Sequence, residues 1–315
     1  METCLTSNYI KITEKLKSPN FSPQKIKLKS KNLNNNGNNN YNDIIDCDII
    51  ECFCEALQNN TTFKGKLDLS YNNLNELHLF NILSTVYENE NISGINIKHN
   101  KITKLVLNKL LLIINNKANI KYLNIQNTYL NNQEIKNIIY SSLSHNYIET
   151  LKLPYLHIEV FPFFIKHLNE NNFINKLHIL ITSRDFINSN NSIFHDNAKE
   201  TYENCIQKLR KLFKELYNVV ENKENIKNVK FEIDFHDQEI EDLIDCIKYT
   251  CEKHKESLKK EQKNNEDAIE ISSFEKIQLL MSDIKGTKKH IKKFEKEVPL
   301  HFNKDIVNLI QKMLP

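Results

Sequence analysis

The chain has 315 residues, 40% of them hydrophobic, and a formal net charge of +3. This size allows a large buried core, and the charge is too small to indicate nucleic-acid binding by itself. No apolar run approaches the roughly 20 residues of a bilayer span, and residues 1–17 lack the order of a secretion signal, so we expect a soluble protein. The seven cysteines form no dense framework, which favours the reducing cytoplasm. Secretion as an effector by a signal-less route stays open.

Asparagine, lysine and isoleucine are abundant, whereas tryptophan is absent and glycine occurs four times. This pattern indicates a nucleotide-composition bias that enriches some residue types regardless of their role. Single lysines and asparagines therefore carry less weight than usual in the interpretation of this sequence.

The N-terminal elements are predicted to be a cap over residues 1–20, a strand around Ile26 and Leu28, and a helix over 44–57. An asparagine-rich tract within about 32–42 indicates a disordered loop. Lysines at a sheet edge discourage unwanted strand pairing, and anion binding is the alternative role. The lysines that alternate along this first strand are Lys25, Lys27, Lys29 and Lys31.

A strand pattern, apolar-x-x-apolar-x-apolar, begins at Ile92, Ile120 and Ile148, at a constant spacing of 28 residues. Its inner pair stands one period earlier as Leu67 and Leu69. The segments after the strands carry apolar residues at helical spacing, and these also recur every 28 residues. One such series is Leu79, Leu107, Ile135 and Phe163, and a second is Ile82, Leu110 and Ile138. Agreement between two independent periodicities predicts a repeated strand–helix unit.

The later part of the chain keeps the pattern less regularly, with predicted strands at 174–179 and 226–231. The 52 residues between their starting points indicate a missing repeat or one long inserted helix, which 198–222 would supply. We therefore assign a solenoid to 21–235. Apolar stripes at helical spacing in 236–315 predict a helical C-terminal cap or extension, and an independent module is the alternative.

Residues 67–74, LDLSYNNL, resemble the consensus L-x-L-x-x-N-x-L, and residues 95–102, INIKHNKI, match it as well. With its 28-residue unit, the chain is similar to the ribonuclease-inhibitor-like class of leucine-rich repeat proteins. The resemblance implies an α/β solenoid with a parallel β-sheet on the concave face and helices on the convex face. It also implies that Asn72 and Asn100 cap backbone groups in the turn after each strand. Thr128 and Leu156 stand at this position in later units.

Side chains between the buried positions of the strands should point onto the concave face. Equivalent outward-facing positions of successive strands form three rows across the units, and these rows contain one acidic residue. In one row, Pro154 is predicted to stand between Gln126 and Leu180. Such a surface favours a protein partner with an acidic surface. The predicted partner-binding residues are Lys66, Asp68, Ser70, Tyr71, Asn96, Lys98, His99, Tyr122, Asn124, Gln126, Lys152, Tyr155 and His178. The alternative is that composition bias alone placed them there.

Motifs for catalysis are missing from the sequence. Glycines at only 37, 65, 94 and 286 cannot form the phosphate-binding loops, and neither G-x-S-x-G nor H-E-x-x-H occurs. Arginine occurs only as Arg184 and Arg210. Two cysteine groups, Cys47, Cys52, Cys54 and Cys246, Cys251, His254, lack the spacing of a zinc site. We expect no enzyme activity, metal, cofactor or small-molecule substrate.

These observations predict a non-catalytic scaffold for protein–protein interaction. One alternative assigns binding of an anionic membrane or of nucleic acid to a basic C-terminal helix, with the repeats as a spacer. Its lysines are Lys285, Lys288, Lys289, Lys292, Lys293 and Lys296. A second alternative comes from the resemblance, because some relatives with this repeat type activate small GTPases.

Overall fold

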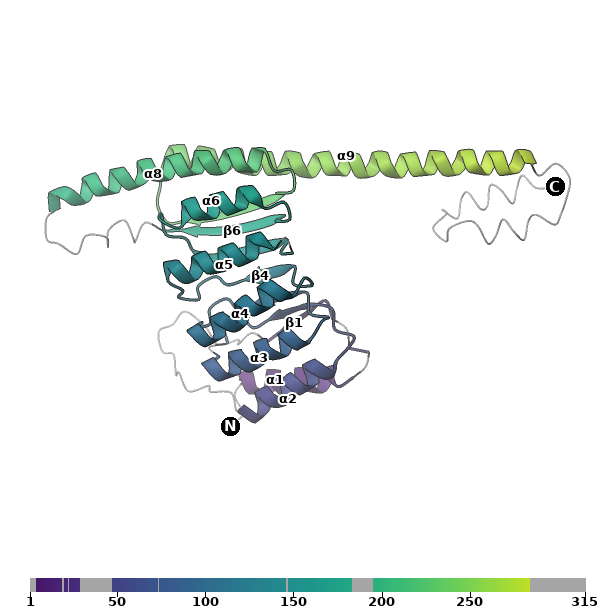
Figure 1. Ribbon diagram of the computed structural model, residues 1–315, viewed down its shortest axis with the longest axis horizontal. Helices are drawn as coiled ribbons and strands as arrows, with labels where there is room; N and C mark the ends of the chain where they lie inside the picture. Colours follow the sequence, from purple (N-terminus) through teal and green to yellow (C-terminus); the bar gives the residue numbers. More distant parts are fainter. Residues whose placement is uncertain are drawn as a thin grey trace. The chain divides into compact units, whose positions relative to one another are not determined.

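The computed structural model describes residues 4–18, 20–21, 23–28, 47–72, 74–145, 147–182 and 195–283. The chain forms two compact units, Met1–Lys255 and Glu256–Pro315. In the first unit, seven parallel strands form one open sheet whose order follows the chain (Figure 1). The strands are β1 (Lys25–Lys27), β2 (Lys66–Asp68), β3 (Gly94–Asn96), β4 (Tyr122–Asn124), β5 (Thr150–Tyr155), β6 (Lys176–Ile181) and β7 (Asn228–Ile233).

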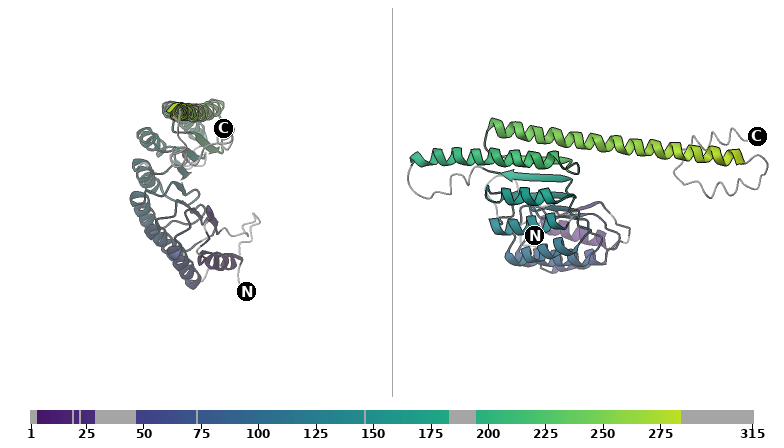
Figure 2. Two further views of the ribbon diagram at one scale, coloured as in Figure 1. Left: turned by 90° about the vertical axis from the view of Figure 1, so that its right-hand side faces the viewer. Right: turned by 45° about the horizontal axis from the view of Figure 1, so that its top comes forward.

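Helices precede, connect and follow these strands. They are α1 (Cys4–Leu16), α2 (Cys47–Asn59), α3 (Glu76–Glu88), α4 (Lys104–Asn116), α5 (Asn132–Ser144), α6 (Phe161–Glu170), α8 (His195–Glu221) and α9 (Gln238–Asp283). Within the first unit, α2 to α6 lie along the outer side of the arc and the strands along its inner side (Figure 2). This is a repeat solenoid of the predicted α/β class, with a C-terminal helix.

The strand register confirms the predicted alignment. Leu67 pairs with Ile95, Ile95 with Leu123, and Leu123 with Leu151. The row extends to Ile26 on β1 and through Leu177 to Val229 on β7. All seven side chains are at most 5% exposed, because they point away from the inner face and pack against the helices.

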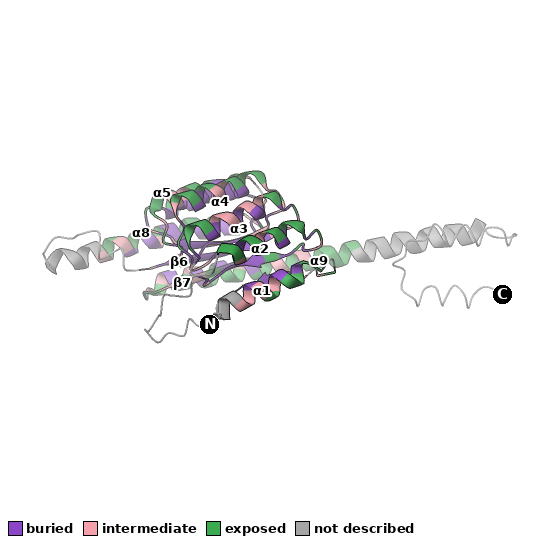
Figure 3. Ribbon diagram, turned by 90° about the horizontal axis from the view of Figure 1, so that it is seen from below, coloured by how far each residue is buried: buried purple, intermediate pink, exposed green. Residues whose placement is uncertain are grey.

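The helices contribute the other half of the core. The series containing Leu79 and Ile82 are buried as predicted except at Phe163, and helical residues alternate between buried and exposed in Figure 3. The predicted insertion is also present, because α8 lies between β6 and β7, which pair directly. There is therefore no missing repeat at that point. Burial of Leu209, Phe213 and Leu216 holds α8 against the core.

One extra residue in β5 shifts the register of the positions after it. Lys152 pairs with His178, but the next pair is Tyr155 with Leu180, so a bulge lies between them. The prediction that Pro154 stands beside Leu180 is therefore wrong. The same shift accounts for Phe163, which is partly buried, while Phe164 is fully buried in its expected place. A bulge displaces every later position by one residue.

A ladder of buried asparagines joins neighbouring helices, and we call Asn60, Asn89 and Asn171 the asparagine ladder. Each donates its side-chain amide to a carbonyl at the end of the preceding helix, at 2.8 Å to Leu16, 2.9 Å to Leu57 and 2.6 Å to Leu143. Each side-chain oxygen also accepts a backbone N–H just ahead in its own turn. These amides satisfy helix-end carbonyls that would otherwise lack donors.

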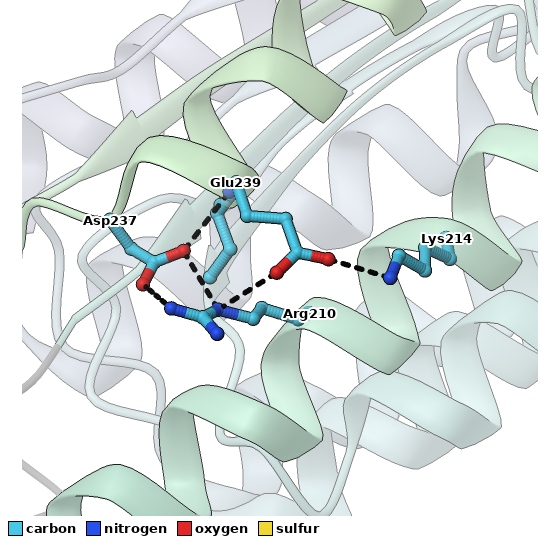
Figure 4. A network of polar contacts seen from close by, with 5 residues as sticks. Arg210, Lys214, Asp237 and Glu239 are labelled. Carbon is cyan, nitrogen blue, oxygen red and sulfur yellow. Dashed lines mark hydrogen bonds and ion pairs between the residues drawn. The ribbon is translucent and has the colours of Figure 1, made fainter.

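An ion-pair network fixes the start of α9 against α8 (Figure 4). The Arg210 guanidinium donates to both carboxylate oxygens of Asp237, at 3.1 and 2.7 Å, and it also contacts Glu239 at 3.3 Å. Asp237 in turn accepts the backbone N–H of Ile240 and so caps the helix. The hydrogen bonds from Arg210 hold the pKa of Asp237 below its ordinary value. Arg210 therefore has a structural role here, and Arg184 lies outside the described residues.

The assignments to residues 1–20, 21–235 and 236–315 stay predictions. The tract 32–42, Lys29, Lys31 and the basic segment Lys285–Lys296 lie outside the described residues. Of the C-terminal segment, α9 is described as a helix to Asp283.

Candidate binding surface on the inner face of the sheet

The inner face carries the alternate side chains of the seven strands. The register aligns two complete rows across the sheet. The first row is Lys25, Lys66, Gly94, Tyr122, Thr150, Lys176 and Asn228, and the second is Lys27, Asp68, Asn96, Asn124, Lys152, His178 and Lys230. Lysine is the commonest residue in both rows, so the face is basic.

Three predicted contact residues in the second row have a structural role instead. Asp68, Asn96 and Asn124 are 3%, 9% and 4% exposed. Their side-chain oxygens accept the backbone N–H two residues ahead, at 3.1 Å from Ser70, 3.2 Å from Lys98 and 3.2 Å from Gln126. This local bond closes the turn at the end of each strand. These groups are consequently occupied within the fold.

Asp68 is the centre of a larger network. Its carboxylate also accepts hydrogen bonds from the Ser70 hydroxyl at 2.6 Å and the Asn96 amide at 2.7 Å, and it pairs with the Lys25 ammonium at 2.6 Å. Burial alone would raise the pKa of Asp68, but the bonds from Lys25 and Ser70 outweigh it and lower that pKa. Asp68 is thus neutralised by a lysine of the same face.

The first row brings a lysine onto an aromatic ring two strands away. The Lys66 ammonium lies 4.4 Å from the centroid of the Tyr122 ring, and Gly94 stands between them in register. A Cβ at Gly94 would come within 2.7 Å of the Tyr122 Cβ and 3.0 Å of the Lys66 Cγ. Gly94 is therefore required for this close cation–π contact.

Lys152 approaches the same ring from the other side along the sheet, with its ammonium 5.7 Å from the Tyr122 centroid. Partial burial lowers the pKa of Lys152 first, and the positive charges of Lys98, Lys230, Lys25 and Lys66 lower it further. Lysines from β1, β2, β7 and the turn after β3 thus lie close enough to act on the charge of Lys152. Such clustering concentrates positive potential on the inner face.

His178 and Glu232 occupy the part of this face formed by β6 and β7. The His178 Nε2 lies 2.9 Å from a Glu232 carboxylate oxygen, and Lys230 lies 2.8 Å from the same carboxylate. Burial lowers the pKa of His178, and the charge of Glu232 opposes this effect. Glu232 therefore neutralises Lys230, as Asp68 neutralises Lys25.

A column of turn residues borders the rows. Tyr71, His99 and Asn127 stand at 28-residue steps with positive φ values of 61°, 58° and 53°. The Tyr71 and His99 rings stack with centroids 4.0 Å apart, and the Asn127 amide nitrogen lies 3.0 Å from His99 Nε2. Left-handed backbone costs about 1 kcal/mol or more for a residue with a side chain, so packing along the column must offset this strain.

Asn100 caps its turn as the resemblance implied. Its amide donates to the carbonyls of Leu69 at 2.9 Å and Ile97 at 3.0 Å, and its oxygen accepts the Leu74 N–H at 3.2 Å. Asn72 is buried and directs its amide toward the Tyr9 hydroxyl at 3.4 Å. Thr128 departs from the consensus, yet its hydroxyl donates to the Ile125 carbonyl at 2.7 Å, which is one of the bonds that Asn makes elsewhere.

The predicted partner-binding residues thus divide into two groups. Asp68, Ser70, Asn96, Asn124, Gln126 and His178 are buried. Lys66 is exposed, and Tyr71, Lys98, His99, Tyr122, Lys152 and Tyr155 are partly exposed. Sequence reasoning missed Lys230 and Glu232, although extending the rows to the last predicted strand would have found them.

Comparison with known proteins adds little to this geometry. No protein-family model matches the chain, and no curated protein matches it. Among solved structures, the chain is similar to "Leiomodin-1 Actin-Binding Site 2 (ABS2)" at 11% identity, with 85% of this chain and 99% of that chain covered and a TM-score of 0.27. A likeness at this TM-score carries no argument about function.

Neither a metal site nor a membrane span is found among the described residues. Within these ranges, no three His, Cys, Asp or Glu side chains gather in a way that could hold a metal ion. No helix in the same part of the chain has both the length and the apolar content to cross a membrane. Cys47, Cys52, Cys54, Cys205, Cys246 and Cys251 are free thiols.

Proposed function

We propose that this chain is a non-catalytic protein-interaction scaffold of the leucine-rich repeat type, which binds a protein partner on the inner face of its sheet. Support comes from the repeat architecture, because stacked repeats present one long surface built from many strands. The observation that carries the proposal is the set of accessible lysines around Tyr122, which lack a carboxylate partner among the described residues.

The chemistry of this surface favours a partner with an acidic surface. Its two described carboxylates, Asp68 and Glu232, are already paired with lysines. Uncompensated positive charge increases the rate of encounter with acidic proteins. Partly exposed aromatic side chains, such as Tyr71 and Tyr155, would supply large rigid contacts of the kind that carry interface energy. We place this activity in the cytoplasm, where the free thiols would remain reduced.

Affinity purification with mass spectrometry tests the proposal. The full chain would be compared with the double variant Lys98→Glu/Lys152→Glu. The matched control is Lys104→Glu/Lys166→Glu, because both lysines are exposed on helices and the change in net charge is the same. We expect partners captured by the unaltered chain and by the control to be lost with the inner-face variant. Undiminished capture by the inner-face variant would remove this face from the proposal.

A further inference from the structure

Five lysines on the inner face, Lys27, Lys66, Lys98, Lys152 and Lys176, have no acidic partner in the described part of the chain, and three of these contact aromatic rings. Lys25 is paired with Asp68, and Lys230 with Glu232, whereas Lys66, Lys98 and Lys152 contact aromatic rings instead. We call Lys66, Lys98 and Lys152 the lysine triad. Its three positive charges lie on one face without carboxylate partners. The resulting positive potential attracts anions to this face.

Aromatic contacts hold the triad in place before any ligand arrives. Lys66 and Lys152 reach the Tyr122 ring from β2 and β5, and the Lys98 ammonium lies 5.9 Å from the Tyr71 centroid. A flexible lysine normally loses side-chain entropy when it binds a ligand, and positioning it beforehand reduces that loss. The arrangement therefore favours binding through these three groups over lysines exposed elsewhere.

An unmatched donor lies beside the triad. Gln126 lies in the turn after β4, one 28-residue repeat after Lys98, and its backbone carbonyl accepts the His99 N–H at 3.1 Å. The side chain of Gln126 is buried, and its amide nitrogen has no hydrogen-bond acceptor in the structure. A buried donor without an acceptor is unfavourable, but this nitrogen is closed to solvent, so the triad and not Gln126 is the group that a ligand can reach.

The spacing of the triad indicates what kind of anion fits. Adjacent strands lie about 4.8 Å apart and each residue adds about 3.3 Å along a strand. Relative to Lys66, the register places Lys152 two residues and Lys98 four residues further along the strand direction, so the three backbone positions form a triangle with sides of roughly 12–16 Å. In an extended peptide, side chains two residues apart point to the same side at about 7 Å spacing. An extended peptide lying on this face can therefore present carboxylates about four residues apart to different lysines of the triad.

We propose that the lysine triad, positioned by Tyr122 and Tyr71, binds the side-chain carboxylates of an extended acidic segment in the partner. This inference rests on the proposed function and names the chemistry that the inner face recognises. All three residues are lysines, whose ammonium groups act as single point charges. Arginine is favoured where one ligand group is bound through bidentate hydrogen bonds to two of its oxygens. Carboxylates distributed along a chain match this set.

The test uses the full chain and fluorescent peptides in an anisotropy titration. The acidic probe alternates glutamate with serine, the neutral control replaces each glutamate with glutamine, and a third peptide carries one phosphoserine in the neutral sequence. We expect the acidic probe to bind and the neutral peptide not to bind. Affinity for the acidic probe should fall as salt rises from about 50 to 200 mM, because the contacts are partly exposed.

Variants of the triad determine whether it is the site. Lys98→Glu/Lys152→Glu should weaken binding of the acidic probe at least about tenfold, while Lys104→Glu/Lys166→Glu should leave it within about twofold. The milder Lys98→Gln/Lys152→Gln removes positive charge without introducing negative charge and should also weaken binding. Circular dichroism of each variant shows whether it is folded.

Three outcomes would overturn the inference. Unchanged binding by the folded Gln variant would exclude the triad, and equal binding of acidic and neutral peptides would exclude carboxylate recognition. Tighter binding of the phosphoserine peptide than of the acidic probe would assign the site to phosphate. If the acidic probe fails but partners are still captured through the inner face, the scaffold function stands and only the acidic ligand is wrong.

Discussion

Lys66 and Tyr122 face each other across Gly94, and the lysine ammonium lies 4.4 Å from the centre of the ring. The contact joins β2 to β4 over a strand that contributes no side chain at this position. A glycine within a strand usually weakens it, yet here its small size permits the approach of two larger groups. The approach of Lys66 to the Tyr122 ring therefore depends on Gly94.

Replacing Gly94 with Ala should destabilise the first unit by about 1–3 kcal/mol, because the new methyl group would meet the Tyr122 Cβ at 2.7 Å. Urea unfolding followed by circular dichroism measures the change. Ser93→Ala serves as the control, since Ser93 is partly exposed and its hydroxyl makes only a 3.3 Å bond. Equal stability of Gly94→Ala and the unaltered chain would show that the sheet adjusts without strain.

Replacing Tyr122 with Leu should remove the two cation–π contacts while keeping apolar bulk. We expect a loss of about 0.5–2 kcal/mol in the free energy of unfolding. Tyr122→Phe keeps the ring and should lose less, limited to the hydrogen bond of the hydroxyl with Asn124. If Phe and Leu are equally destabilising, the ring contacts with Lys66 and Lys152 contribute nothing measurable.

Asp68 should make stability depend on pH in the acid range. Its folded pKa lies below the ordinary value of 3.8, so its stabilising effect is complete above that value and is lost as pH falls through the lowered folded pKa. Asp68→Asn should reduce stability at pH 7 and flatten this acid dependence. Asn is a suitable replacement because Asn96 and Asn124 make the same turn-closing bond in the same row. Unfolding free energies between pH 2 and 7 that change in parallel for both proteins would contradict this assignment.

Asn89→Ala tests the asparagine ladder. The substitution leaves the Leu57 carbonyl and the Asn91 N–H without their partners, at a cost of about 1–3 kcal/mol. Asn115→Ala is the matched control, because Asn115 is exposed within α4 and alanine is the better helix former. The two variants should therefore differ in urea midpoint, and similar midpoints would deny the ladder a stabilising role.

The regular part of the fold was predictable from sequence because its signal is periodic. Leu67, Ile95 and Leu123 recur at one spacing, and parallel strands of equal repeats must align in register. The bulge in β5 was not predictable, since Pro154 and Tyr155 both fit the end of a strand. One inserted residue also moved Phe164 into the place expected for Phe163.

The candidate site was predicted only in part, because alternation gives direction but not accessibility. Asp68 and Asn124 do lie in the inner-face rows, but both are buried and used in turn closure. Attributing asparagine to composition bias also hid the ladder residues, such as Asn89, whose partners are backbone carbonyls. Backbone partners leave no residue-type signature in the sequence, so these bonds appear only in three dimensions.

The asparagine ladder has a consequence for how the solenoid comes apart. Each of its amides belongs to one repeat and grips the helix end of the repeat before it. These bonds span the boundaries α1–α2, α2–α3 and α5–α6, whereas Lys117 and His145 occupy the equivalent positions after α4 and α5. Separating two repeats that share such a bond leaves a helix-end carbonyl without its donor, so these three boundaries should cost more free energy to open than the two between α3 and α5.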